Sequence, residues 1–535
     1  MTASALHRRW ESPLLFFAAL LWVPGAGGNA FLSDDIGHLS AWGLPPFDQV
    51  WQWFYKQDFS YYRPLTALLW KVEFSLWGLN PLGYQLVNFA LHTGCALLVR
   101  QLGLLLFPGA NRAGFLAALV FLFLPGHIFG VLMVSALTGL LCSLFYLAAA
   151  VCYLRGRAGS RPALFLGPLF FTLALGTKEL ALALPLLIGT WEIIALRTEQ
   201  RLTATRWLKA CLPYGAVAAL YLVLRWILFA QMPHSPLHAH PTATRLLVNI
   251  TTYAAKSVAP WGLEGLKPLF RANRPALVLV AAGAMVLAAG LAWRDRRSIE
   301  TGHVFGFFWF GIATLPVASL YSPWNTYLPS VGTALILGAF ADWTRSITRK
   351  RERQVAAGLF LALCIIYSLN HQQHWLEARD LCARLAATVE QESGGTVYLA
   401  NLPAEWNEAP LYVGDWALRG ALHLQGNNRQ VVALANVIKN RAEDRLETIL
   451  LDDSTFALRL TTPGEFFRLE STEILSGARR PTRGYAYNKS GADISVAGLD
   501  TQGEANALHI TMGSPEDMAL VRVWDGKRLI PLVAP

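Results

Sequence analysis

The sequence predicts a polytopic α-helical membrane protein of about 11 transmembrane helices with a C-terminal extracytoplasmic α+β domain. Of its 535 residues, 54% are hydrophobic and only 15% are charged, whereas a soluble domain carries about 25% charged residues. The charge also divides the chain: residues 1–371 hold 29 Lys and Arg against 14 Asp and Glu, while residues 372–535 hold 16 against 21. This split indicates a basic membrane face and a separate acidic domain, and it argues against a nucleic-acid-binding protein.

Apolar stretches long enough to cross roughly 30 Å of hydrocarbon occur eleven times before residue 372. They lie near residues 12–27, 84–107, 113–134, 136–154, 162–177, 180–196, 207–230, 275–293, 302–320, 327–343 and 354–370. Residues 246–263 are interpreted as an interfacial helix on the outer face, because a further span there would export the cluster Arg294 to Arg297. The sequence thus predicts a transmembrane domain, 1–371, with an outer loop at 28–83.

The basic residues set the orientation of these spans. Clusters such as Arg155/Arg157/Arg161 and Arg345/Arg349/Lys350 fall in loops on one side, which is typical of the cytoplasmic face. We therefore expect a multi-pass protein of the bacterial inner (cytoplasmic) membrane, with a cytoplasmic N-terminus and a periplasmic C-terminal domain. Residues 1–27 also resemble a signal peptide, but we expect an uncleaved first span that keeps the outer loop tethered to the bundle.

The domain at 372–535 combines two patterns. It begins with a helical pattern, HWLEARDLCARLAATVEQ, and continues with short β-like runs such as TVYLANL, RQVVALANVI and TFALRL. This mixture predicts an α+β domain.

An acidic pair, Asp34 and Asp35, comes directly after the first span. Two neighbouring carboxylates where water is scarce can have raised or split pKa values and can act as catalytic acids or bases. They could instead bind a divalent cation, or form a solvated turn or a helix N-cap. No cofactor is otherwise expected.

Three cations are predicted at the outer face: Arg63, Lys178 and Arg225. A charge at bilayer depth costs about 2.5 to 3.5 kcal/mol and usually marks a functional site, and a guanidinium can grip phosphate oxygens with two hydrogen bonds. For Arg225, snorkelling to the interface is the alternative. Lys178 and Glu179 are adjacent and point in different directions on a helix, so we expect each to have another partner.

Metal and nucleotide sites lack support. His234, His238 and His240 lie in a Pro-rich loop without the spacing of a metal site, and no GxxxxGK[ST], HExxH, GxSxG or CxxC motif occurs. His127, between two spans, is a candidate for substrate contact.

Four blocks carry a resemblance to a known family. The acidic pair, YYRPLTALLWKVEFSLWGLNPLGYQLVNFALH at 61–92, GTKELALALPLL at 176–187 and NTYLPSVG at 325–332 resemble the polytopic glycosyltransferases of the GT-C fold. The nearest branch is the membrane protein O-mannosyltransferases and their bacterial relatives. The resemblance covers about residues 30–345 and not the tail. It implies transfer of a sugar from a polyprenyl-phosphate donor to an acceptor on the outer face, which makes the chain a hexosyltransferase.

The resemblance also implies roles for single residues. Asp34 matches the first acid of the family's pair and is the expected general base, with Asp35 beside it; Arg63 matches the arginine of the YRP block. Lys178 and Glu179 match the KE pair. The expected donor-phosphate ligands are Arg63, Lys178 and Arg225, and the expected substrate contacts are Glu179, Tyr62, His127, Asn325 and Tyr327. The family's HPxH motif is replaced by Leu124 to His127, and its charged residues in the next span by Leu137 and Gly139.

Two other functions stay open on this sequence. A lipid or glycan transporter (flippase) would also need many spans and a lipid-phosphate site, although no paired broken helices in two similar halves are visible. A non-catalytic assembly subunit is favoured by the replaced family charges. The expected partners are membrane lipid, a polyprenyl-phosphate sugar and a protein, lipid or glycan acceptor, with no nucleic acid.

Overall fold

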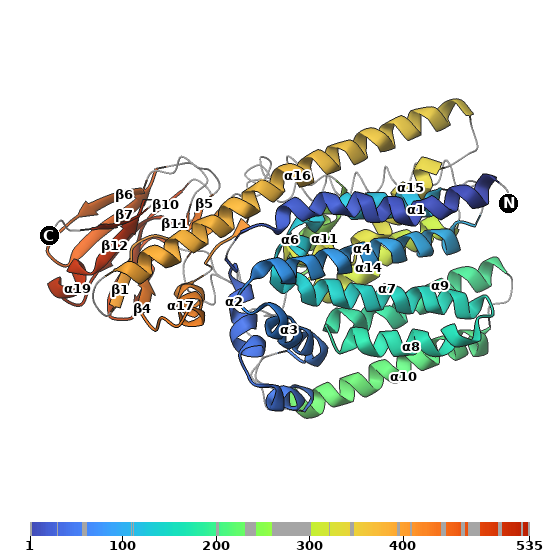
Figure 1. The fold of residues 1–535 in the computed structure, drawn as a ribbon, viewed down its shortest axis with the longest axis horizontal. Helices are drawn as coiled ribbons and strands as arrows, with labels where there is room; N and C mark the ends of the chain where they lie inside the picture. The colour runs from blue at the N-terminus through green and yellow to red at the C-terminus, as the bar shows by residue number, and fades with distance from the viewer. Residues whose placement is uncertain are drawn as a thin grey trace.

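The structure, a computed structural model, joins a bundle of helices to a strand-containing part through one long helix, α16 (Ile347–Gln391) (Figure 1). The N-terminus lies at the end of the bundle far from the strands. Helix α16 runs without a break through residue 372, where the predicted tail begins. The structure describes residues 3–532 except 29, 56–60, 109, 111, 200–202, 230–241, 259–300, 320, 343–346, 393–395, 407–408, 413, 440–445, 462–465, 469–481, 501–504 and 526–527.

The bundle is built from apolar helices that often begin at proline. Pro81 opens one of them, since a proline in the first turn loses no hydrogen bond, and the Asn80 side chain caps the same end by accepting from Leu82 N (3.1 Å). The bundle helices are α1 (Ala3–Ala19), α4 (Pro81–Leu106), α5 (Ala113–Phe123), α6 (Ile128–Leu132), α7 (Leu137–Arg157), α8 (Arg161–Leu175), α9 (Leu184–Thr198), α10 (Ala204–Phe229), α11 (Ala243–Val258), α14 (Thr301–Thr314) and α15 (Ser330–Asp342).

Within the described residues, five helices have the length and hydropathy of a membrane span: Pro81–Leu106, Val134–Arg157, Glu179–Thr198, Ala204–Leu228 and Gln354–Gln391. A sixth results if α5 and Pro125–Leu132, bent by 53°, form one span. Shorter apolar helices stand at Trp10–Ala26, Arg161–Leu175, Thr301–Val317 and Ser330–Phe340. The chain is a multi-pass membrane protein, but the count of eleven spans is not confirmed, and the predicted span at 275–293 lies outside the described residues.

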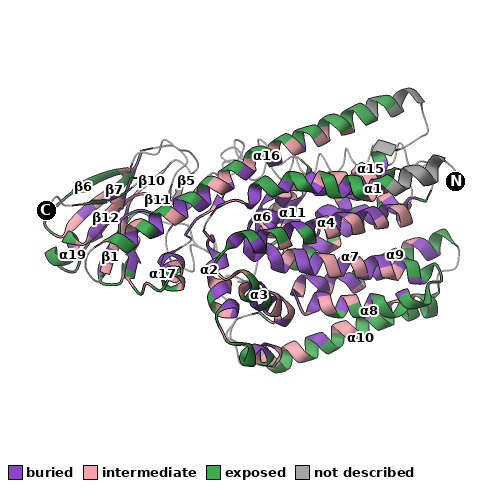
Figure 2. Cartoon of the chain, in the orientation of Figure 1, coloured by how far each residue is buried: buried purple, intermediate pink, exposed green. Residues whose placement is uncertain are grey.

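The outer surface of the bundle is apolar. Leu220 and Trp226 on α10 are each 72% exposed, and Leu359 on α16 is 62% exposed. Figure 2 shows α10 and the bundle half of α16 largely exposed, whereas α4 and α7 are mostly buried. Such an apolar surface is unfavourable in water, so these faces lie against lipid.

The first helix is tied firmly to the bundle. Glu11 and Arg100 form a buried ion pair (2.6 Å), and Trp22 Nε1 donates to the carbonyl of Leu122 (3.1 Å). Just after this segment, the Arg379 guanidinium on α16 donates to the carbonyls of Gly25 and Gly27, each at 2.7 Å. The chain between α1 and the outer loop is therefore fixed from two sides.

The outer loop at 28–83 folds into short helices. They are α2 (Asp34–His38), the π-helical turn η2 (Leu39–Gly43), η3 (Phe47–Phe54) and α3 (Pro64–Trp77). In Figure 1, α2 lies at the end of the bundle that meets the strand-containing part. Helix α11 covers most of the segment predicted as interfacial; it is not among the candidate spans, and Asn249 Nδ2 ties it to Ala318 O (2.8 Å).

The C-terminal part contains strands and short helices, so a strand-containing C-terminal domain is confirmed. One sheet has the order β13-β12-β1-β4, a second, fully antiparallel sheet has the order β6-β7-β11-β10-β9, and a third has the order β3-β2-β5-β8. The strands are β1 (Thr396–Leu399), β2 (Leu402–Trp406), β3 (Ala409–Pro410), β4 (Gln430–Ala433), β5 (Asn436–Lys439), β6 (Leu446–Leu450), β7 (Thr455–Leu460), β8 (Phe466–Arg468), β9 (Ala486–Lys489), β10 (Ala492–Leu499), β11 (Ala505–Thr511), β12 (Val521–Trp524) and β13 (Leu529–Pro531), with helices α17 (Asp415–Leu424) and α19 (Pro515–Ala519).

Helix α17 connects this part to the outer loop. It packs against α2, and the approach is close: a Cβ at Gly420 would lie 2.7 Å from Ile36 Cγ2. Since α2 carries the acidic pair, the C-terminal part lies next to the predicted site.

Candidate active site

A cavity of about 470 Å³ lies where several elements end: α2, the start of α7, the turn before α9, the turn η10 (Pro323–Thr326) and α17. Its wall combines charged, aromatic and small side chains. The lining residues are Asp34, Gly37, His38, Trp42, Tyr61, Arg63, Met133, Ser135, Ala136, Thr138, Gly139, Lys178, Glu179, Leu180, Pro316, Val317, Ser319, Ser322, Trp324, Asn325 and Trp416.

The acidic pair is divided between this cavity and the core. Asp34 is exposed and lines the cavity. Asp35 is buried; its carboxylate accepts from Leu32 N (3.1 Å) and from Ser135 N (2.7 Å). Ser33, just before the pair, has a positive φ of 41°, which is uncommon for a residue other than glycine. The two carboxylates therefore have different surroundings, although they are adjacent in the sequence.

Asp35 serves as a cap from a distant segment. Ser135 belongs to the 3₁₀ turn Val134–Ala136, which leads directly into α7. The carboxylate thus satisfies an N–H group at the start of a long helix, where negative charge is favourable. Burial still raises the pKa of Asp35 to about 6, against the opposing effect of its two backbone donors.

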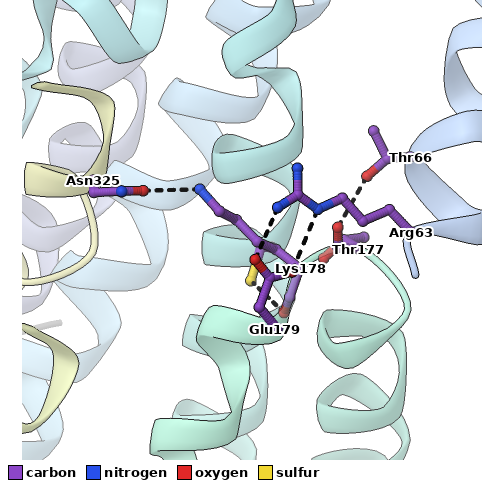
Figure 3. A network of polar contacts seen from close by, with 7 residues as sticks. Arg63, Thr66, Thr177, Lys178, Glu179 and Asn325 are labelled. Atoms are coloured by element: carbon purple, nitrogen blue, oxygen red, sulfur yellow. Dashed lines mark hydrogen bonds and ion pairs between the residues drawn. The ribbon is translucent and has the colours of Figure 1, made fainter. Parts of the chain in front are cut away.

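Lys178 and Glu179 each have a partner other than the neighbouring residue, as the sequence predicted. Figure 3 shows Lys178 Nζ donating to Asn325 Oδ1 (2.9 Å) and the Arg63 guanidinium reaching Glu179 (2.9 Å). The same view shows Thr66 Oγ1 donating to Thr177 O (3.2 Å), which ties α3 to this turn.

The charge of Arg63 is largely balanced within the wall. Its Nε and Nη2 atoms both contact the Glu179 carboxylate, at 3.4 and 2.9 Å, and its guanidinium lies 4.1 Å from the centre of the Tyr61 ring. Lys178 has a neutral amide as its described partner. Direct contacts therefore compensate the charge of the lysine less than that of the arginine.

Sequence reasoning missed His38. Its ring stacks on Trp42 at 4.6 Å and an interplanar angle of 7°. Burial, together with the charge of Arg63, lowers the pKa of His38 to about 3, so the ring is neutral at physiological pH. The four-residue spacing from Asp34 would have placed both side chains on one face of a helix.

Trp416 was also missed, and no local signal could have found it. It lies on α17 in the C-terminal part and is 44% exposed. A Cβ at Gly37 would lie 3.4 Å from Trp416 Cζ3, so the indole is beside α2. Only the packing of α17 on α2 brings this side chain to the cavity.

Other predicted site residues do not line the cavity. Tyr62 precedes Arg63 of the wall, and its ring lies 6.2 Å from that of Tyr221, one turn before Arg225 on α10. His127 and Tyr327 are buried in the bundle with their rings 4.5 Å apart. Asn325, Glu179, Lys178 and Arg63 do meet at the cavity wall with Asp34.

Metal-binding side chains do not gather in the part of the chain that the structure describes: it holds no group of three His, Cys, Asp or Glu residues that could share an ion. Asp34 and Asp35 do not face one another across a common site. The loop with His234, His238 and His240 lies outside the described residues.

Sequence comparison finds similar proteins that are named O-mannosyl-transferases. The chain is 36% identical over 105 residues to the human protein O-mannosyl-transferase TMTC4, a match that covers 17% of this chain and 14% of that protein. It is 24% identical over 450 residues to the mouse TMTC4 protein, covering 69% of this chain and 60% of that protein. It is 32% identical over 144 residues to Drosophila Tmtc3, covering 23% and 14%. The chain thus spans at most about three fifths of these relatives.

Solved structures give a weaker similarity, and no family model matches the chain. The oligosaccharyltransferase of Archaeoglobus fulgidus has a TM-score of 0.43 at 11% identity and covers 79% of this chain and 64% of that one. ArnT from Cupriavidus metallidurans bound to undecaprenyl phosphate has a TM-score of 0.41 at 11% identity and covers 95% and 98%. The sequence matches show that this chain is similar to proteins named O-mannosyl-transferases.

Proposed function

We propose that the chain is an integral membrane glycosyltransferase that moves a sugar from a polyprenyl-phosphate-sugar donor to an acceptor hydroxyl. One observation carries this proposal: Asp34, Lys178 and Arg63, from three separate segments, line one cavity at an end of the bundle. The reaction needs a base for the acceptor hydroxyl and positive charge for the leaving phosphate, and a carboxylate and cations in one site provide both. Sequence similarity to proteins named O-mannosyl-transferases supports the reaction class.

The reaction forms one bond and breaks one. The acceptor oxygen attacks the anomeric carbon, Asp34 takes the hydroxyl proton, and the bond between that carbon and the phosphate oxygen breaks. A single displacement of this kind inverts the configuration at the anomeric carbon. Asp34 suits the role of base because it is at the cavity surface.

The cations act on the leaving group. The departing polyprenyl phosphate gains negative charge as the bond breaks, and fixed positive groups in a water-poor cavity stabilise that charge. Lys178 and Arg63 line the cavity and are the proposed groups. Arg225 lies on α10, one turn after Tyr221, and would act on a phosphate nearer the lipid.

The arrangement of the chain supports the predicted orientation. Helix α2, which carries Asp34 of the cavity wall, and the C-terminal part lie at the end of the bundle opposite the N-terminus (Figure 1). The last turn of α7 carries Arg155 and Arg157. We place the cavity on the periplasmic face of a bacterial inner membrane, with the prenyl chain in lipid and the sugar in the cavity.

The test uses the purified full chain in detergent or nanodiscs with a panel of polyprenyl-phosphate sugars, mannose first. Wild-type protein should transfer sugar to an acceptor mixture of peptide, lipid and glycan hydroxyls. Asp34→Asn should lower turnover by at least a hundredfold while donor binding is retained. Asp48→Asn, in the same loop but away from the cavity, is the matched control. Wild-type turnover in Asp34→Asn would remove this residue from the mechanism.

The same assay separates the alternatives. A flippase would move fluorescent polyprenyl-phosphate sugar across proteoliposomes without sugar transfer, and an assembly subunit would do neither. Transfer by the purified chain alone excludes both as its main function.

A further inference from the structure

Thr138, at the start of α7, has a buried hydroxyl that lacks a partner. The residue is 4% exposed and lines the cavity. Among the described residues, no hydrogen-bond partner is found for its Oγ1 atom. A buried hydroxyl without a hydrogen bond costs free energy, so this atom is a candidate for contact with a ligand.

Other helical threonines of the chain show what is unusual here. Thr93, Thr172, Thr190 and Thr314 each donate to the carbonyl four residues earlier, at 2.6 to 3.0 Å. This internal bond is the ordinary solution for threonine in a helix.

For Thr138 the equivalent acceptor is the Val134 carbonyl. That oxygen accepts from Leu137 N, and Asn88 Nδ2 lies 3.5 Å from it. The usual bond is not found for Thr138 among the described residues, and its hydroxyl can donate to another acceptor.

Thr138 and Lys178 line the same cavity, and α7 contacts the turn that carries Lys178. Cys142, one helical turn after Thr138 on the same face of α7, has its Sγ atom 3.7 Å from Lys178 O. Both Thr138 and Lys178 line the cavity. Gly139 also lines it, and a Cβ there would meet nothing within 4 Å, so space is open beside the threonine.

Lys178 can bind a ligand together with the Thr138 hydroxyl. An ammonium group has three donors, and Asn325 accepts one of them. Arg63 is less suited as the main ligand because Glu179 contacts two of its nitrogens.

We propose that Thr138 and Lys178 together bind a phosphate group in this cavity. The Thr138 hydroxyl donates to one phosphate oxygen, and Lys178 supplies the positive charge and a second donor. This assignment rests on the proposed function, in which the group is the phosphate of the polyprenyl donor. It adds Thr138 to the donor site. This residue is not one of the positions, such as Leu137 and Gly139, where the chain lacks a charged residue of the family.

The experiment measures binding, so no acceptor is needed. Undecaprenyl phosphate is titrated into the purified full chain, with native mass spectrometry as the readout, and inorganic phosphate is tested as a competitor. Thr138→Val keeps the shape and removes only the hydroxyl, and should weaken the Kd about tenfold, since the bond to a charged group is lost. Thr138→Ser should bind as wild type does.

Two variants complete the design. Lys178→Met should abolish specific binding. Thr172→Val, whose hydroxyl is bonded within its own helix on the exposed side of α8, should leave the Kd unchanged. If Thr138→Val does not fold, the comparison of Thr138→Ser with Thr138→Ala replaces it.

The outcomes distinguish the two proposals. An unchanged Kd in Thr138→Val with lost binding in Lys178→Met overturns the role of Thr138 and leaves the proposed function in place. Unchanged binding in both variants overturns the phosphate site and weakens the proposed function with it. Competition by inorganic phosphate that depends on Thr138 supports the site and identifies free phosphate as a further ligand.

Discussion

At the scale of single residues, the acidic pair shows how adjacent side chains acquire different roles. Asp34 is at the cavity surface, whereas Asp35 is buried and holds N–H groups of two segments. The sequence predicted the pair as a unit because nothing in two adjacent letters tells which side chain faces the core. The contact with Ser135, a hundred residues away, decides it.

The raised pKa of Asp35 predicts a pH-dependent stability. The pKa is about 6 in the folded protein and about 3.9 in an unfolded chain, so the folded state binds this proton more tightly. The resulting stabilisation is complete below about pH 4 and is lost as the pH rises through 6. Asp35→Asn lacks this titration. It also loses one of the two side-chain oxygens that accept from the backbone N–H groups of Leu32 and Ser135. Its Tm should therefore be below that of the wild type, by more at pH 5 than at pH 7.5.

Thermal unfolding of both proteins across this range checks the prediction. Asp48→Asn should follow the wild type at each pH. A Tm difference that stays constant, or that widens with rising pH, would contradict the assignment to Asp35.

The low pKa of His38 leads to a prediction about how sugar transfer depends on pH. Its pKa near 3 keeps the ring neutral throughout the working range, so it should contribute no change in rate between pH 5 and 8. His38→Gln, which keeps a polar side chain, should alter the amplitude of sugar transfer but leave the apparent pKa values of kcat/KM unmoved. A profile whose acidic limb disappears in this variant would show that the histidine titrates in that range.

At the scale of elements, the sequence predicted helices well where length and hydropathy agree. The stretches at 84–107 and 136–154 correspond closely to α4 and α7. The stretch at 113–134 was predicted as one helix, but the chain bends by 53° at Leu124 and Pro125, since proline disfavours helix at the residue before it. Hydropathy alone does not reveal such a break in a helix.

The buried contacts of the first helix predict that residues 1–27 remain in the mature protein. Glu11 and Arg100 are each less than 8% exposed at the side chain and form an ion pair. Removing one partner would leave a buried charge, which is strongly destabilising. Arg100→Gln should lower the Tm by several degrees, and Glu11→Gln combined with Arg100→Gln should restore part of that loss. Mass spectrometry of the purified wild type should find residues 1–27 present.

A protein whose mature N-terminus lies near residue 28 would contradict this prediction directly. Arg112→Gln, at the exposed start of α5, serves as the control for the loss of one arginine.

At the scale of the whole molecule, the cavity is completed by a part of the chain that the sequence treated as separate. The resemblance stops near residue 345, yet Trp416 lines the cavity with Asp34 and Gly37. Composition and periodicity assign each segment to an element but contain no information on the docking of α17 against α2. This is why charged residues that line the cavity could be proposed from the sequence, whereas Trp416 could not.

The close contact between α17 and α2 allows this docking to be tested. A side chain at position 420 would overlap Ile36, because the Cβ alone comes within 2.7 Å of it. Gly420→Val should therefore displace α17 and move Trp416 from the cavity. We expect sugar transfer to fall about tenfold through a higher acceptor KM, because the aromatic wall lies on the Asp34 side, where the acceptor hydroxyl must bind. Donor binding at Lys178 should be unchanged.

Two comparisons make this result specific. Gly358→Val places the same side chain on α16 where a Cβ meets nothing within 4 Å, and it should behave as the wild type. Trp416→Ala removes the indole without adding atoms at the contact of Gly420 with Ile36, and it should reproduce the higher acceptor KM. If Gly420→Val impairs transfer while Trp416→Ala does not, the docked helix matters through the position of α2, and the indole is not an acceptor contact. If both variants keep wild-type kinetics, the C-terminal part has no role in the transfer reaction, since its approach to the acidic pair would then be without consequence.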